Sequence, residues 1–335
     1  MKQEILVVTG VLAGVIAASH FMFGLSPTEL WAANSPQSAT TQQVVSGPPA
    51  NDEGYYPRVA SSDSVPANDR ADNHNHLIAA AAASLANSPP LEARLRFKIN
   101  LFDEEISGPG RYYQKGQGTR LSRIEFEFGF HQSGVQLHQF CDGQMLYNLT
   151  IAGEKQNLEY VDLRELDGLQ QSVASSSRVA SWLSVGSLTG LMEQLATHFD
   201  FTEIEEVQLD SIPAIRCTGQ WRAPALARLL EGQIEADAVR DDIVRWQQLP
   251  RQLPHQVRLT LGKDDRFPWF PYRIVFEQYT LQDEELVVRE IAVLELYELR
   301  HAPHLTDEMF LIPDIDAPPR ESTEFYRKRI LQFTR

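Results

Sequence analysis

Two stretches of the chain alternate strictly between apolar and polar residues. Residues 95–101 read LRFKINL, and residues 124–130 read IEFEFGF. Side chains on a β-strand point alternately to opposite faces, so this period of two is typical of a strand with one buried and one solvated face. Such strands belong to antiparallel sheets, because parallel sheets are buried on both faces. The chain is therefore expected to form an antiparallel sheet.

Further strands and several helices are predicted along the same region. The helices are expected at 77–86, an alanine-rich run that ends at Pro89-Pro90, at 187–199, where leucines recur at spacings of three and four, and at 225–247. The fold class is therefore α+β. Alternation slips near Val293-Leu294, which predicts a β-bulge. The remaining strands are expected at 135–141, 144–150, 157–163, 204–209, 213–221, 256–262, 271–280 and 286–299.

The first 25 residues predict a membrane segment. Residues 5–25 contain no Asp, Glu, Lys or Arg. As a helix they would span roughly 31 Å, which matches a hydrocarbon core about 30 Å thick. Lys2 places the N-terminus in the cytoplasm by the positive-inside rule. We expect a single-pass anchor in the inner membrane, with the following domain in the periplasm. The alternative is a signal peptide cleaved near Trp31.

The rest of the chain divides into three further parts. Residues 26–75 are rich in Ser, Pro, Asn, Asp, Gln and Ala, a composition that predicts a disordered linker. Residues 76–320 are expected to form one β-rich domain, and residues 321–335 a helical tail in which Tyr326, Ile330 and Phe333 share one face.

Charge and motifs narrow the function. With 30 Lys and Arg against 45 Asp and Glu, the net charge is −15, which disfavours nucleic acid as a partner. No G-x-S-x-G, H-E-x-x-H, P-loop or C-x-x-C motif occurs. Two pairs, His74 with His76 and His301 with His304, lack a third ligand nearby and predict no metal site. We therefore expect neither an enzyme nor a cofactor.

The two cysteines leave an alternative open. Cys141 and Cys217 both fall in predicted strands. They are either buried free thiols or one disulfide, and their spacing does not decide between the two.

The apolar strand residues, covered by an amphipathic helix, predict a cavity. Leucines at 188, 191 and 195 form an apolar stripe that could cover the concave face of the sheet. Such a cavity would bind an apolar ligand, whereas the alternative is an ordinary closed core. The residues expected to line it are Phe97, Ile99, Leu101, Phe126, Phe128, Leu188, Leu191 and Leu195.

Four segments, in order, resemble the LolA/LolB lipoprotein-carrier superfamily. They are 119–126 (TRLSRIEF), 140–147 (FCDGQMLY), 270–276 (FPYRIVF) and 310–313 (FLIP). The resemblance covers about residues 76–320. It implies an unclosed half-barrel sheet with helices as a lid over an acyl-chain cavity. It also implies a cation near the cavity, at Arg120 or Arg123.

The chain departs from that superfamily in its anchor, its long linker and an inserted helical segment near 225–248. A tethered domain cannot diffuse across the envelope, so local hand-off is expected rather than free shuttling. The expected function is non-catalytic binding of a lipid or lipoprotein acyl chain in the cell envelope. The alternative is an envelope sensor that uses the same fold to bind a protein partner.

Overall fold

The computed structural model describes residues 67–101, 104–130, 133–166, 187–210, 212–229, 254–282, 285–315, 318–324 and 327. The predicted anchor at 5–25 lies outside the described residues, as does most of the predicted linker. None of the helices in the described ranges is both long enough and apolar enough to cross a membrane.

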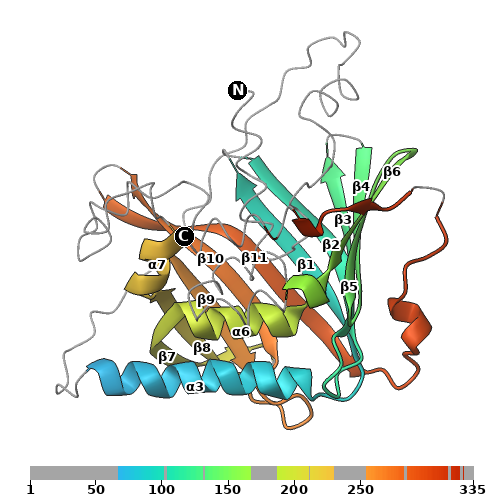
Figure 1. Cartoon of the computed structure of the whole chain (residues 1–335). Coiled ribbons are helices and arrows are strands. Elements are labelled where there is room, and N and C mark those ends of the chain that lie inside the picture. Colours follow the sequence, from blue (N-terminus) through green and yellow to red (C-terminus); the bar gives the residue numbers. More distant parts are fainter. Residues whose placement is uncertain are drawn as a thin grey trace.

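Within the described residues, twelve strands form a single sheet (Figure 1). They are β1 (Leu91–Leu101), β2 (Glu104–Gln114), β3 (Leu121–Phe130), β4 (Ser133–Asp142), β5 (Met145–Ala152), β6 (Lys155–Asp162), β7 (Phe199–Leu209), β8 (Ile212–Trp221), β9 (Gln256–Gly262), β10 (Pro271–Gln282), β11 (Glu285–His301) and β12 (Arg320–Glu321). Their order is β12-β6-β5-β4-β3-β2-β1-β11-β10-β9-β8-β7, so β12 and β7 are the two edges of an open sheet. Neighbours are antiparallel except β12 and β6, which are parallel.

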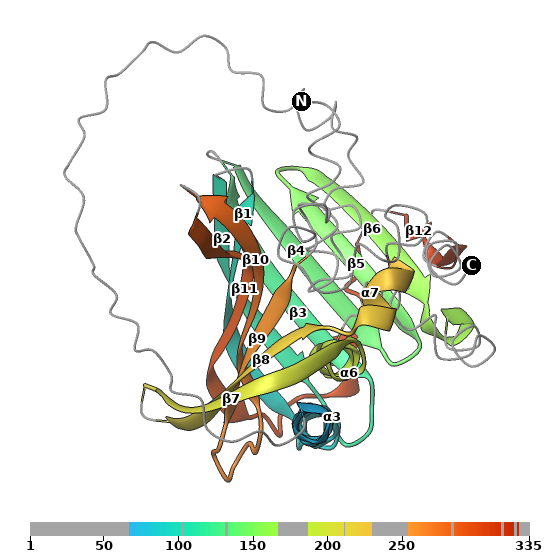
Figure 2. The same ribbon diagram turned by 90° about the vertical axis from the view of Figure 1, so that its left-hand side faces the viewer.

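The sheet curves strongly, and helices cross its concave side. Helices α3 (Ala67–Ala86) and α6 (Leu188–His198) lie against each other across that side, while α7 (Ala223–Leu229) follows β8 (Figures 1 and 2). Ser187 caps α6, because its Oγ accepts a hydrogen bond from the backbone N–H of Gly190 at 3.0 Å. The expected α+β architecture with an unclosed antiparallel sheet is confirmed.

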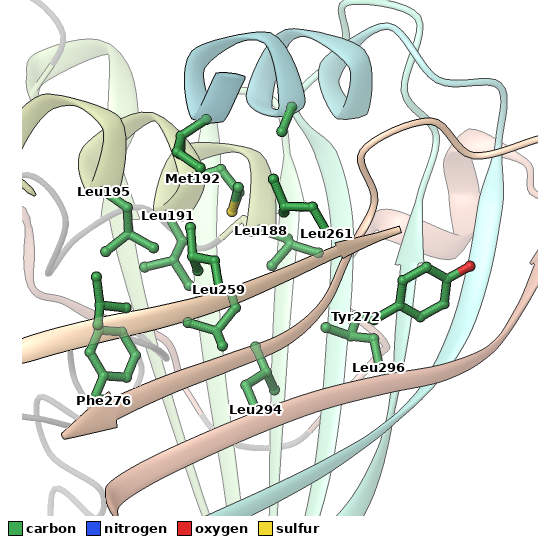
Figure 3. Packing of buried hydrophobic residues seen from close by; sticks show 14 of the residues in the cluster. Leu188, Leu191, Met192, Leu195, Leu259, Leu261, Tyr272, Phe276, Leu294 and Leu296 are labelled. Atoms are coloured by element: carbon green, nitrogen blue, oxygen red, sulfur yellow. The ribbon is translucent and has the colours of Figure 1, made fainter. Parts of the chain in front are cut away.

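One large apolar cluster joins the helices to the sheet. In α3 the buried side chains recur at spacings of three and four, as a helix with one buried face requires. Figure 3 shows the α6 side chains directed toward those of β9, β10 and β11. The labelled residues of this contact are Leu188, Leu191, Met192, Leu195, Leu259, Leu261, Tyr272, Phe276, Leu294 and Leu296.

The folded region begins earlier than the sequence predicts. Helix α3 starts at Ala67, so the interpretation of residues 67–75 as disordered linker is wrong. Asn75 explains the difference, because its Nδ2 donates to Asp200 Oδ1 at 3.1 Å and its Oδ1 accepts from Phe201 N at 3.0 Å. These bonds to β7 are tertiary contacts that composition cannot reveal.

Other boundaries also shift. The predicted bulge lies in β11, but at Ile291, where Phe276 and Glu277 pair with Ala292 and Glu290. Of the helix predicted at 225–247, residues 225–229 lie in α7 and residues 230–247 lie outside the described residues. The predicted helical tail lies mostly outside them too, and β12 occupies its start.

Gly110 on β2 leaves no room for a side chain between its two neighbouring strands. A Cβ there would lie 2.2 Å from the backbone oxygen of Glu125 and 2.5 Å from Leu95 Cδ1. We expect Gly110→Ala to lower the free energy of unfolding by about 1–3 kcal/mol, measured by chemical denaturation. Ser107→Ala, exposed on the same strand, should change it by no more than about 0.5 kcal/mol. Equal effects of the two substitutions would contradict this packing.

Candidate functional site

The predicted cavity residues come together on the inner face of the sheet. Phe97, Ile99 and Phe126 are buried there, and the rings of Phe97 and Phe126 meet edge to face with centroids 5.5 Å apart. The three predicted leucines of α6 belong to the same cluster. The side chains of Leu101 and Phe128 lie outside the described part of the structure.

A groove opens where this cluster reaches the surface. Its volume is about 270 Å³, somewhat below the roughly 300–1,000 Å³ of pockets that hold a whole small ligand. Leu85 and Leu91 line both the groove and the core, so the groove leads directly to the buried apolar face. The aromatic residues of segment 267–270, just before β10, are the sequence feature that could have predicted this groove. The lining residues are Ser84, Leu85, Asn87, Ser88, Pro89, Leu91, Arg266, Phe267, Pro268 and Phe270.

The two candidate cations lie on different sides of the sheet. Arg123 is on the convex face, where its guanidinium lies 4.7 Å from the ring centre of Phe140 and donates to Met309 O at 3.2 Å. The prediction that Arg123 is a cation near the cavity is therefore wrong, because its side chain lies on the face opposite the predicted cavity residues. Arg120 is exposed just before β3, close enough to α6 that its charge opposes the rise in the pKa of Glu193 caused by lost hydration. Of the two, Arg120 is the one near α6, which covers the inner face of the sheet.

One row of side chains on the inner face of β4, β5 and β6 is polar. Gln139, Asn148 and Glu159, one from each strand, are buried and lie opposite one another. Sequence reasoning missed this row, because its members are nine and eleven residues apart and only the strand register aligns them.

The two cysteines and His255 are buried, and their pKa values are those expected of side chains packed in a core. Cys141 and Cys217 are free and buried, which decides between the two alternatives for the cysteines, and burial raises their pKa values to about 11 and about 12. Burial also lowers the pKa of His255 to about 4. Such thiols are inert at neutral pH. Across the ranges that the structure describes, His, Cys, Asp and Glu side chains form no group of three or more that could hold a metal.

Comparison with protein-family models and with curated proteins finds no match. Among solved structures, the chain is similar to a putative outer membrane lipoprotein-sorting protein domain from Vibrio parahaemolyticus, at 9% identity and a TM-score of 0.32 over 72% of this chain and 97% of that one. It is also similar to a LolA superfamily protein from Nitrosomonas europaea, at 11% identity and a TM-score of 0.29 over 71% and 97%.

A third similar structure is a DUF1329 family protein from Desulfovibrio piger, at 10% identity and a TM-score of 0.33 over 71% of this chain and 96% of that one. Of these three solved structures, the one from Nitrosomonas europaea is described as a LolA superfamily protein.

His255 predicts a specific acid sensitivity. Its Nδ1 accepts a hydrogen bond from the Tyr279 backbone N–H at 2.9 Å, so the folded state favours the neutral ring. Between the folded pKa of about 4 and the unfolded value of about 6.5, the unfolded chain binds more protons. The neutral His255 ring therefore makes its full contribution to the free energy of unfolding above pH 6.5, and this contribution is lost as the pH falls toward 4.

We expect His255→Gln to flatten the dependence of the unfolding free energy on pH between 4 and 6.5. The flattening should reach at most about 1.4 kcal/mol per pH unit, the value for one proton. Denaturant titrations of both proteins across that range measure it. Identical slopes would contradict the assignment of a buried neutral ring.

Proposed function

We propose that the concave face binds the acyl chain of a lipid or lipoprotein in the cell envelope, without covalent chemistry. One observation carries this proposal: the apolar inner face is covered by two helices, α3 and α6, rather than by a second sheet. A helix can move away from a sheet without breaking any pairing between strands, so it can act as a lid. Transfer of each methylene from water to such a face contributes about 0.8 kcal/mol.

The groove beside the end of α3 supports a route of entry. It is too small to hold a long acyl chain by itself, but it adjoins Leu85 and Leu91 of the buried cluster. An acyl chain entering there would take the place of the helix side chains against the sheet. The apolar surface of the sheet would therefore stay covered, and its dispersion interactions would be kept.

The expected anchor and linker set the mode of action. With residues 5–25 in the inner membrane, the domain would reach only partners near that membrane. Local hand-off of a lipid or lipoprotein in the periplasm is therefore the function we favour over free carriage.

A second candidate function is binding of an envelope protein, and a separate surface favours it. The hairpin of β10 and β11 exposes three large apolar side chains on one face near its tip, of which Leu281 is 55% exposed. Clustered exposed apolar residues are typical of protein interaction sites. The other two are Leu286 and Val288.

The test measures binding of the methyl esters of fatty acids of eight to fourteen carbons by displacement of a neutral fluorescent acyl ester from the purified full-length chain. We expect affinity to rise about fourfold per methylene, the ratio that corresponds to about 0.8 kcal/mol. No displacement at any chain length would overturn the proposal.

A pair of α6 variants locates the site. Leu191→Phe enlarges a side chain that faces the sheet, which should cost about 1–3 kcal/mol of stability and weaken binding at least tenfold because the ring fills the required space. Met192→Leu conserves volume on the same helix and should leave binding nearly unchanged. A thermal transition in each variant shows that it is folded, and unchanged binding by folded Leu191→Phe would place the site elsewhere.

A charge at Phe126 is a poorer test. This side chain is only 3% exposed and contacts Phe97, so a carboxylate there would lose its hydration without gaining a partner and would unfold the domain.

A further inference from the structure

A row of side chains on the inner face changes from apolar to polar across the sheet. Register places Tyr112 opposite Ile124, Ile124 opposite Gln139, Gln139 opposite Asn148, and Asn148 opposite Glu159. Residues opposite one another on adjacent strands share a face. Tyr112 and Ile124 belong to the large apolar cluster, so the polar members continue the surface to which we assign the acyl chain.

The polar members are deeply buried, yet one of their polar atoms has no partner among the described residues. Gln139, Asn148 and Glu159 are 1%, 4% and 5% exposed. Gln139 Nε2 donates to Asn148 Oδ1 at 2.9 Å, whereas Gln139 Oε1 has no hydrogen-bond partner in the described part of the chain. Burying an amide atom without a hydrogen bond opposes folding, so such an atom indicates a place for a ligand atom.

The orientation of the amide does not remove this feature. If the Gln139 amide is rotated by 180°, its oxygen faces the Asn148 oxygen, and two acceptors cannot bond to each other. The Asn148 amide must then rotate as well, so that its NH₂ group donates to the Gln139 oxygen. The NH₂ group of Gln139 then takes the unpartnered position. A hydroxyl group suits either orientation, because it both donates and accepts a hydrogen bond.

The charges around the row disfavour an anionic ligand. Burial raises the pKa of Glu159, while the Arg320 guanidinium, 3.9 Å away, and hydrogen bonds with Asn157 and Ser322 oppose the rise. The Glu159 carboxyl group is thus already paired with the Arg320 guanidinium at the edge of the sheet. A second carboxylate beside Glu159 would be repelled, whereas a neutral hydroxyl would not.

We infer that Gln139, with Asn148 and Glu159 beside it, binds the hydroxyl groups of a neutral amphiphile whose acyl chain lies on the adjoining apolar face. This inference rests on the proposed acyl-chain binding and adds the chemistry of the head group. A glycerol ester has this combination: a neutral polar end with free hydroxyls and a single apolar chain.

The test compares two ligands with the same twelve-carbon chain in the purified full-length protein. Monolauroylglycerol carries two hydroxyls, and methyl laurate carries none. Displacement of a neutral fluorescent acyl ester gives the affinity of each. We expect monolauroylglycerol to bind at least tenfold more tightly, because a buried site built to bond a hydroxyl disfavours the analogue that lacks it.

Gln139→Met removes the amide while nearly conserving side-chain length. It should abolish most of the preference for monolauroylglycerol and leave the affinity for methyl laurate unchanged. Gln136→Met is the matched control, since Gln136 is exposed on the same strand and lies on the opposite face. It should keep the preference of the natural chain.

The outcomes separate the two proposals. Equal affinity of the natural chain for both ligands would overturn the head-group site and leave acyl-chain binding intact. Binding of neither ligand would overturn both. A Gln139→Met variant that is more stable but keeps the full preference would show that the unpartnered amide only opposes folding, which also overturns the inference.

Discussion

The pairing of β1 with β11 holds the structure together. Residues near position 95 meet residues near position 296, so this one contact joins the two ends of the described chain. On one side of this pair, the chain runs outward from β1 to β6, and on the other side it runs back inward from the edge strand β7 to β11. Without it, two smaller sheets would each expose an apolar face. With it, Phe97 lies opposite Leu294 and Ile99 opposite Ala292, and a continuous inner face forms beneath α3 and α6.

Burial on the inner face decides the register more strongly than charge on the outer face. On the convex side Arg273 pairs with Glu290 at 3.2 Å and with Glu295 at 3.3 Å, and Arg96 also reaches Glu295 at 3.5 Å. Partly exposed pairs of this kind contribute about 0–1 kcal/mol each. Complete burial of a Phe or Leu contributes about 1.5–3 kcal/mol, and a shift of one residue would expose every such side chain.

Local pattern was enough to predict the strands and most helices, whereas contacts between distant segments were not predictable. Period-two alternation identifies β1 and β3 because each has one wet face, and the leucine spacing identifies α6. The same alternation could have excluded Arg123 as a cavity residue, since it precedes the inward-facing Ile124.

The start of α3 was missed because Asn75 bonds to residues 125 and 126 positions away, which no local pattern records. The polar row was missed for the same reason: Gln139, Asn148 and Glu159 become one surface only through the register of three strands.

The central claim is that this inner face holds an acyl chain, and native mass spectrometry of the full-length chain purified from cells tests it most directly. The account predicts a protein ion carrying one additional mass, which organic extraction releases as a molecule with a single class of acyl chain. A protein ion at the mass of the polypeptide alone, from preparations extracted from the membrane with an amphipathic copolymer in place of detergent, would contradict it.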